Sequence, residues 1–415
     1  MRAGPQVAAG AAAAAARPFV LILLCGCLIS LLTFGLRSSF GLFTGPVSAT
    51  HGWSREIFAL AMAIQNLGWG IAQPIGGALA DRFGPARVLA GGGLLYALGL
   101  ALTALSTTPG ALYLSAGVLV GFGMGGASYI SVLAALGKIV PPGRRSWALG
   151  VATAAGSLGQ FLLLPLGQAF IAAYGWQITA LLLAAMAATV PALASAFAGA
   201  RPAPSTEAEP ELGLGETLRA AFGHPSYLLL LTGFFVCGFQ LAFVTIHLPP
   251  YLADRGIDAS LAAWSLALIG LFNIVGAYLA GVLGERHSNK MLLCWLYLGR
   301  AVATALFLTF PISPVSVLLF AAAMGLLWLS AVPPTSGLVA LMFGTRYMAT
   351  LFGIVFLNHQ LGSFVGVWLG GLLYERTGSY DVVWWLSVVL SLAAAMVHLP
   401  IAERPAPRFA TAGAR

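Results

Sequence analysis

Long apolar runs alternate with short polar intervals along nearly the whole chain. A helix that crosses a bilayer needs about 20 mostly apolar residues. When breaks are placed at charged residues, glycines and prolines, twelve runs meet this requirement. Crossing helices are therefore predicted at 19–43, 57–80, 88–107, 111–138, 146–172, 177–198, 226–251, 260–284, 291–310, 314–341, 348–373 and 381–401. The fold class that follows is an all-α membrane protein with twelve transmembrane helices.

The longest polar interval divides these runs into two sets of six. Residues 201–211 are rich in proline and glutamate, which predicts a flexible linker, and a short amphipathic stretch follows at 214–222. We therefore expect a six-helix bundle on each side of the linker and a polar tail at each end. The predicted boundaries are 1–18 for the first tail, 19–198 for the first bundle, 199–225 for the linker, 226–401 for the second bundle and 402–415 for the last tail.

A charged motif recurs after the second run of each set. Residues Gly77–Arg87 read GALADRFGPAR, and Gly281–Lys290, 204 residues later, read GVLGERHSNK. Both copies place a glycine, a leucine, an acid and an arginine in the same order. The recurrence predicts two pseudo-symmetric bundles. A simpler explanation, in which the charges only end the second helix of each set, stays open.

Composition indicates which solvent and which partners to expect. Hydrophobic residue types make up 59% of the chain and the mean hydropathy is +0.92, so the surface must face lipid. The 51 glycines suit close helix packing in a bilayer. The net charge of +8 comes from scattered bases, so no nucleic-acid partner is expected. The four cysteines lie in apolar runs without a metal or redox spacing, and we expect neither metal nor cofactor.

The distribution of basic residues predicts the orientation in the membrane. With twelve crossings, 15 of the 20 Lys and Arg residues lie on the side of the N-terminus, and Arg55, Arg255 and Arg376 lie on the other. Loops rich in Lys and Arg stay in the cytoplasm, so both termini are expected there, in a bacterial inner membrane. The remaining two, Arg37 and Arg300, lie inside runs.

The first copy of the motif resembles the signature between helices two and three of the major facilitator superfamily. The matching residues are Gly77, Leu79, Ala80, Asp81, Arg82 and Gly84. Residues 36–43 and 360–380 are similar to the monocarboxylate and oxalate/formate branches of that superfamily. The resemblance implies a secondary transporter, not an enzyme, that functions as a monomer and works by alternating access around a site near the bilayer midplane.

The resemblance also implies a conformational gate at the motif. In the superfamily, the acid of this signature bonds to the other half of the protein and holds the inner side shut. Pro85 stands where the signature has an arginine, and Arg87 supplies a base slightly later. Carried over to both copies, the expected gate residues are Gly77, Asp81, Arg82, Arg87, Gly281, Glu285 and Arg286.

The two arginines inside runs are the first candidates for substrate contact. All twelve acids lie in loops or at the ends of runs. An intramembrane charge costs about 2.5–3.5 kcal/mol on insertion scales and usually faces a cavity, and an anionic substrate would supply the missing negative charge. The alternative for Arg37 is that it snorkels to the outer surface. The alternative for Arg300 is that it bonds backbone carbonyls between helices.

Uncharged polar residues in the runs extend the candidate site. His359 lies midway along the eleventh run, and its unperturbed pKa of about 6.5 suits a proton carrier; a neutral histidine bonded to a neighbouring helix is the alternative. The other polar residues either contact substrate or join helices. They are Gln65, Asn66, Tyr129, Gln160, Gln240, Asn273 and Gln360.

Two functions stay open for the transporter. The first is movement of a small organic anion, a monocarboxylate in particular, with proton symport as one form of coupling. The second is movement of a larger or neutral solute such as a vitamin or drug. It is favoured by the uncharged stretch 269–277, where the monocarboxylate branches often carry an arginine. An enzyme or a sensor is not expected, because the runs hold no catalytic set and no loop is long enough for a signalling domain.

Overall fold

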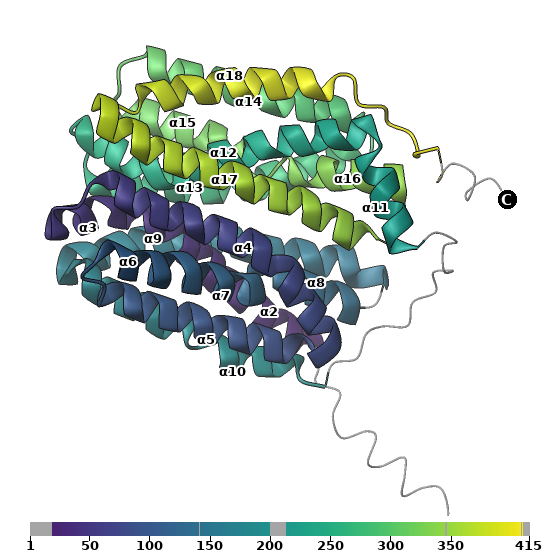
Figure 1. The fold of residues 1–415 in the computed structure, drawn as a ribbon, viewed down its shortest axis with the longest axis horizontal. Helices are drawn as coiled ribbons and strands as arrows, with labels where there is room; N and C mark the ends of the chain where they lie inside the picture. The colour runs from purple at the N-terminus through teal and green to yellow at the C-terminus, as the bar shows by residue number, and fades with distance from the viewer. Residues whose placement is uncertain (1–18, 141, 200–212, 345–346, 408, 410–415) are drawn as a thin grey trace, which may run out of the picture.

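The protein consists of two layers of helices, one from each half of the chain (Figure 1). The structure is a computed structural model that describes residues 19–140, 142–199, 213–344, 347–407 and 409. This described part is mainly helical and contains no strand, which confirms the predicted all-α class. The predicted first tail, residues 200–212 of the predicted linker and the end of the last tail lie outside the described residues.

In the N-terminal half, the predicted runs all fall in helical segments. These are α2 (Phe19–Ser38), η1 (Ser39–Phe43), α3 (Thr44–His51), α4 (Arg55–Phe83), α5 (Pro85–Ala104), α6 (Pro109–Leu112), η2 (Tyr113–Leu119), α7 (Val120–Ala127), α8 (Tyr129–Ile139), α9 (Pro142–Ala187), α10 (Val190–Ala194) and η3 (Ser195–Phe197). Within α9, Gly175 has a φ of +78°, a conformation that glycine adopts without strain. The fifth and sixth runs are therefore two helices joined by a tight turn there.

The C-terminal half repeats this arrangement. It begins with the short amphipathic α11 (Leu214–Phe222) and continues through α12 (Pro225–Asp254), α13 (Ala259–Gly284), α14 (Asn289–Thr309), α15 (Pro314–Leu327), α16 (Val332–Phe343), α17 (Met348–Thr377) and α18 (Asp381–His398). This layer contacts the N-terminal layer mainly through α13, which packs against α9, and through α17, which lies against α4 (Figure 1).

Ten stretches of the described residues are long and apolar enough to cross a membrane. One of them, Trp147–Phe197, contains the turn at Gly175 and so holds two crossings. Helix α4 is not among the ten, although its 29 residues would span about 44 Å. With these two additions, the described helices account for all twelve predicted runs.

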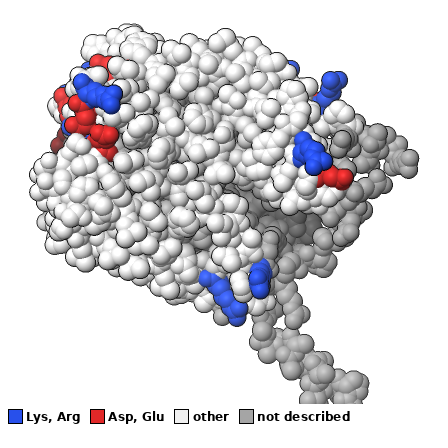
Figure 2. All heavy atoms as spheres, in the orientation of Figure 1, with Lys and Arg blue, Asp and Glu red and all other residues white. Residues whose placement is uncertain are grey.

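Apart from Arg37 and Arg300, the described charged side chains lie at the two ends of the bundle. Helix α2 begins and α18 ends at one end, which we call the terminal end; α4 begins and α12 ends at the opposite end, which we call the latch end (Figure 1). On the face shown in Figure 2, an uncharged band separates basic and acidic residues at the two ends. This is the surface expected of a protein whose middle faces lipid.

Two helices break in the middle of the membrane, one in each half. Between α7 and α8, Ser128 has an extended ψ of 163°, whereas the sequence predicted one continuous helix at 111–138. In the tenth run, α15 ends at Leu327 and α16 begins at Val332. The break thus precedes Pro333 and Pro334, which lie near the start of the new helix. A proline is tolerated in the first turn because no N–H is needed there.

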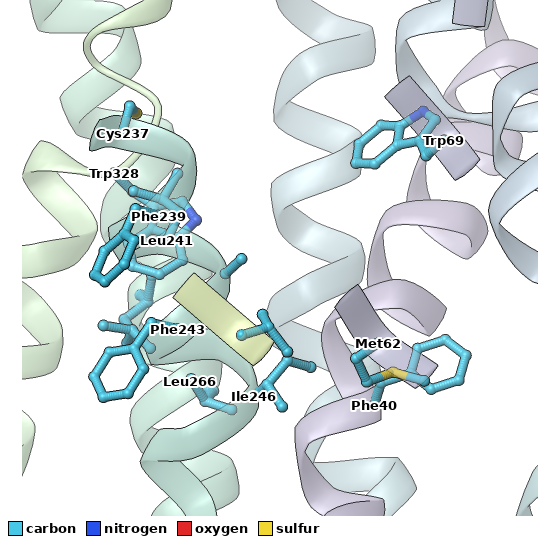
Figure 3. Packing of buried hydrophobic residues seen from close by; sticks show 14 of the residues in the cluster. Phe40, Met62, Trp69, Cys237, Phe239, Leu241, Phe243, Ile246, Leu266 and Trp328 are labelled. Atoms are coloured by element: carbon cyan, nitrogen blue, oxygen red, sulfur yellow. The ribbon is translucent and has the colours of Figure 1, made fainter. Parts of the chain in front are cut away.

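Small residues bring the two halves into contact from the latch end to mid-depth. Gly41 lies against the carbonyl of Thr245 in α12, and Gly371 in α17 lies against Ala59 in α4. Figure 3 shows Ile246, beside Thr245, facing Phe40 and Met62 of the N-terminal half. Because a side chain at Gly41 would overlap the opposite backbone, glycine permits the close approach of the halves at this end.

Candidate functional site

A small cavity lies at the break between α7 and α8. It has a volume of about 10 Å³, the space of roughly one water molecule. It is lined by Thr33, Phe34, Arg37, Trp69, Met124, Ser128 and Tyr129. Two predicted site residues, Arg37 and Tyr129, therefore meet in one cavity.

Arg37 points into the protein toward α4. Its Nη2 donates a hydrogen bond to Oδ1 of Asn66 at 3.1 Å, and its guanidinium lies 4.9 Å from the centre of the Trp69 ring. Asn66 is eleven residues, or about 17 Å, along α4 from the latch end. In the described part of the chain no carboxylate forms an ion pair with Arg37. The charge at this depth therefore has an amide and an aromatic face as its neighbours, but no described counterion.

The wall beside Arg37 is held in place by a hydrogen-bond network that the sequence did not reveal. The indole N–H of Trp69 donates to Oε1 of Gln73 at 3.0 Å. The same oxygen accepts from Ser128 at 3.0 Å, and Nε2 of Gln73 donates to Ser131 at 3.3 Å. Gln73 thus joins the ring that covers Arg37 to the break between α7 and α8. In the sequence, the only sign of this role for Gln73 is its position one helical turn after Trp69.

The C-terminal half approaches this cluster through α17. Phe356 meets Trp69 edge-on, with 5.0 Å between ring centres, and His359 stacks on Phe356 at 5.9 Å. His359 is 8% exposed and lies within electrostatic reach of Arg37. Its Nδ1, like both amide atoms of Gln360, has no hydrogen-bond partner of good geometry among the described residues. These buried atoms lie where α17 meets the N-terminal half.

Arg300 is placed differently from Arg37. Its side chain is fully buried, and its Nε and Nη2 donate to the carbonyl of Leu327 at 3.1 and 2.6 Å. Nη2 also donates to the carbonyl of Trp328 at 2.5 Å, and Nη1 donates to Sγ of Cys237 at 3.2 Å. The guanidinium therefore caps the C-terminal end of α15, where carbonyls have no helical partner. The structure does not bring it into the cavity beside Arg37.

Asn273 stabilises the other side of the same break. Its Oδ1 accepts from the backbone N–H of Leu329 at 2.9 Å, and its Nδ2 donates to the hydroxyl of Ser157 in α9 at 2.9 Å. One amide therefore joins α13, the broken helix and the N-terminal half. Its neighbour along the interface, Gln160, donates to the carbonyl of Leu266 at 3.0 Å.

The remaining two predicted glutamines bond neighbouring helices. Gln65 donates to the carbonyl of Ala116 at 2.8 Å, and Gln240 donates to the carbonyl of Ser387 at 3.3 Å. Neither residue lines the cavity at Arg37.

An ion-pair cluster closes the latch end, and the sequence analysis assigned it no role. Arg55 of α4 binds the carboxylate of Asp254 of α12 through two hydrogen bonds of 2.6 Å. The backbone N–H of Arg55 donates to Glu375 at 2.8 Å, and its side chain donates to Tyr380 at 3.4 Å. Burial opposes the charge on Arg55, but these bonds to Asp254 and Tyr380 outweigh it and raise the pKa of the guanidinium above its ordinary value. The guanidinium thus stays charged throughout the physiological pH range.

The predicted gate residues at the terminal end make no comparable contact. The side chain of Asp81 lies outside the described residues. Arg82 packs over the ring of Phe83, its neighbour in sequence, and Glu285 and Arg286 are exposed. None of the described gate side chains forms an ion pair with a described residue of the other half.

Glycines show how far the contact between the halves extends. At mid-depth, Gly70 of α4 lies against Gln360 of α17. Nearer the terminal end, Gly77 and Gly353 of the same two helices have no atom within 4 Å of the place where a side chain would begin. Close contact between the halves through glycine is thus described at the latch end and mid-depth. The gate role of the motif stays a prediction.

The chain is similar to known membrane transporters over most of its length. The model of the Major Facilitator Superfamily matches residues 25–366 and 230–414. Monocarboxylate transporter 13 of Rattus norvegicus is 28% identical over 391 residues, covering 90% of this chain and 86% of that protein. Monocarboxylate transporter 11 of Homo sapiens is 27% identical and covers 89% and 79%. An uncharacterised MFS-type transporter of Bacillus subtilis, YcxA, is 25% identical and covers 88% and 90%.

Solved structures share the fold at lower identity. A bacterial homologue of the human lysosomal transporter Spinster, described as inward-facing and occupied, has a TM-score of 0.72 at 16% identity and covers 92% of this chain and 97% of its own. A D-xylose–proton symporter has a TM-score of 0.69 at 16% identity and covers 93% and 97%. These likenesses concern the arrangement of the helices.

Proposed function

Because the chain belongs to the major facilitator superfamily, we propose that this transporter carries a small organic anion with one carboxylate and binds it at Arg37. The carboxylate would meet Arg37 at the cavity between α2, α4 and the start of α8, which has room for about one water molecule in this state and would have to widen to admit it. The observation that carries the proposal is the guanidinium of Arg37, which faces this cavity with no described counterion.

The chemistry of Arg37 suits a carboxylate. A guanidinium offers five N–H donors in a planar fork that matches the two oxygens of a carboxylate. Asn66 takes one donor of Arg37, and the Trp69 ring covers the guanidinium. Other donors stay available toward the cavity. Binding an anion there would offset the cost of holding the charge in the membrane.

A single available cation favours a monovalent substrate. Arg300 is the other arginine inside the membrane, but three of its nitrogens already donate to Leu327, Trp328 and Cys237. A dicarboxylate would bring a second negative charge with no described cation to meet it. The names of the monocarboxylate transporters among the relatives support the same substrate class.

The described contacts suit alternating access with the latch end shut. Arg55, Asp254 and Glu375 join the halves at that end, whereas Gly77 and Gly353 toward the terminal end have open space beside them. If both termini are cytoplasmic, as the basic residues predict, the site opens inward in this state. His359, on the C-terminal side of the site, is our candidate for coupling transport to protons.

Uptake into proteoliposomes tests the proposal. Purified protein is reconstituted and offered radiolabelled acetate, lactate, pyruvate and benzoate, with and without an inward proton gradient. Arg37→Ala is expected to reduce saturable uptake at least tenfold, because a charge-assisted bond contributes about 1.5–3 kcal/mol. Arg219→Ala removes an exposed arginine of α11 and is the matched control.

A neutral solute is the second candidate. It is favoured by α13, whose residues Ala259–Gly284 include no charged side chain, and by the aromatic walls of the cavity. If a neutral compound is taken up equally by the wild type and by Arg37→Ala, while no carboxylate is taken up by either, the anion proposal is wrong.

A further inference from the structure

Asn66 is bonded on both sides of its amide group. Its Nδ2 donates to the carbonyl of Met62 at 2.8 Å, one turn earlier in α4. Its Oδ1 accepts from Nη2 of Arg37 at 3.1 Å. The side chain is 4% exposed. A flipped amide would turn its NH₂ group toward the guanidinium, which has no acceptor, so these two bonds leave a single orientation.

We propose that Asn66 is the positioning residue for the substrate carboxylate: it aims the Arg37 guanidinium and leaves its charge unneutralised. This inference rests on the proposed function, because it concerns the same site. An amide oxygen accepts one N–H without contributing a negative charge. A carboxylate in the same place would form an internal ion pair and compete with the substrate.

The bond from Arg37 to Asn66 limits the orientations that the guanidinium can adopt. The guanidinium is held by Asn66 at one nitrogen and is covered by Trp69. Trp69 is itself fixed by Gln73. Ser128 and Tyr129 at the helix break line the same cavity as the guanidinium. Without the Asn66 oxygen, the long arginine side chain regains rotational freedom, and ordering it again weakens binding.

The simpler role for Asn66 is to join α2 to α4. The two roles differ in what Asn66→Leu does, because Asn66→Asp would pair with Arg37 and block transport in either case. As a structural link, loss of the amide would lower stability and leave KM unchanged. As a positioning residue, the same substitution would raise KM.

The experiment measures uptake of lactate and benzoate together with the melting temperature of purified protein. Asn66→Asp is expected to reduce uptake at least a hundredfold at every substrate concentration, with no fall in melting temperature. Asn66→Leu, which keeps the size but removes the acceptor, is expected to raise KM about tenfold with little change in maximal rate.

Asn358 offers a matched control. It is a half-buried amide in α17 that donates to the carbonyl of Leu231 at 2.6 Å and has no cation beside it. Asn358→Leu is expected to change stability without changing KM. The positioning role is overturned if Asn66→Leu keeps the wild-type KM. If Asn66→Asp does not fold, the KM of Asn66→Leu decides alone. If the wild type takes up no carboxylate, the proposed function fails first and this inference fails with it.

Discussion

Arg55 and Asp254 join the two halves of the protein through a two-bond ion pair of 2.6 Å at the latch end. The residues start α4 and end α12, 199 positions apart in the chain. Their side chains are 20% and 30% exposed, so water screens the pair in part. The pair therefore suits a contact that forms and breaks as the halves move.

Removing this ion pair should favour opening of the latch end. A partly exposed pair contributes up to about 1 kcal/mol, so Asp254→Asn is expected to raise the open population about fivefold. The measurement is labelling of Ile246→Cys by a membrane-impermeant maleimide, because Ile246 is 4% exposed and faces the other half. The parent protein without this cysteine supplies the background rate.

Asp381→Asn is the control for this prediction. It removes the acid of the Arg255–Asp381 pair, which lies wholly within the C-terminal half at the same end. Labelling of Ile246→Cys should stay at the rate measured when Ile246→Cys is the only substitution. Equal acceleration by both substitutions would mean that the Arg55 pair has no particular part in closing the latch end.

Arg300 should matter for stability and not for substrate affinity. Its bonds to the carbonyls of Leu327 and Trp328 cap a helix inside the membrane. Arg300→Gln leaves those buried acceptors without a cation, at a cost of about 1–3 kcal/mol for an unsatisfied group. The melting temperature should fall while KM for a carboxylate stays within twofold. A raised KM in a protein of unchanged stability would instead place Arg300 at the site.

His359 should affect coupling more than binding. The expected result for His359→Gln is that exchange of labelled for unlabelled carboxylate continues, while stimulation of uptake by an inward proton gradient is lost. The measurement compares exchange and gradient-driven uptake in the same vesicles. Stimulation that persists at the wild-type level would show that the proton, if one moves, travels by another route.

The sequence predicted those features that depend on local composition. Each crossing helix needs its own stretch of about 20 apolar residues, so the twelve runs can be recognised from the sequence alone. All twelve fall in helices of the structure. Arg37 stood out because every acid lies in a loop or at the end of a run. These signals need no knowledge of which helices are neighbours.

Features that depend on the pairing of helices could not be predicted in the same way. The latch joins Arg55 to an acid 199 residues away, and from the sequence Arg55 was a loop base that marks topology. Arg300 was a candidate for substrate contact because the sequence does not show the groups that hold it. These groups are backbone carbonyls, which are left without helical partners by the break after Leu327. No residue pattern marks the break at Ser128, since serine is also common inside membrane helices.

Equilibrium binding of a monocarboxylate to purified protein tests the central claim most directly. Trp69 lies 4.9 Å from the Arg37 guanidinium, so occupation of the site should change tryptophan fluorescence. Titration with benzoate or lactate should give a saturable change in the wild type and in Arg219→Gln, and none in Arg37→Gln. The same saturable change in Arg37→Gln would show that the anion binds elsewhere and would contradict the account of this site.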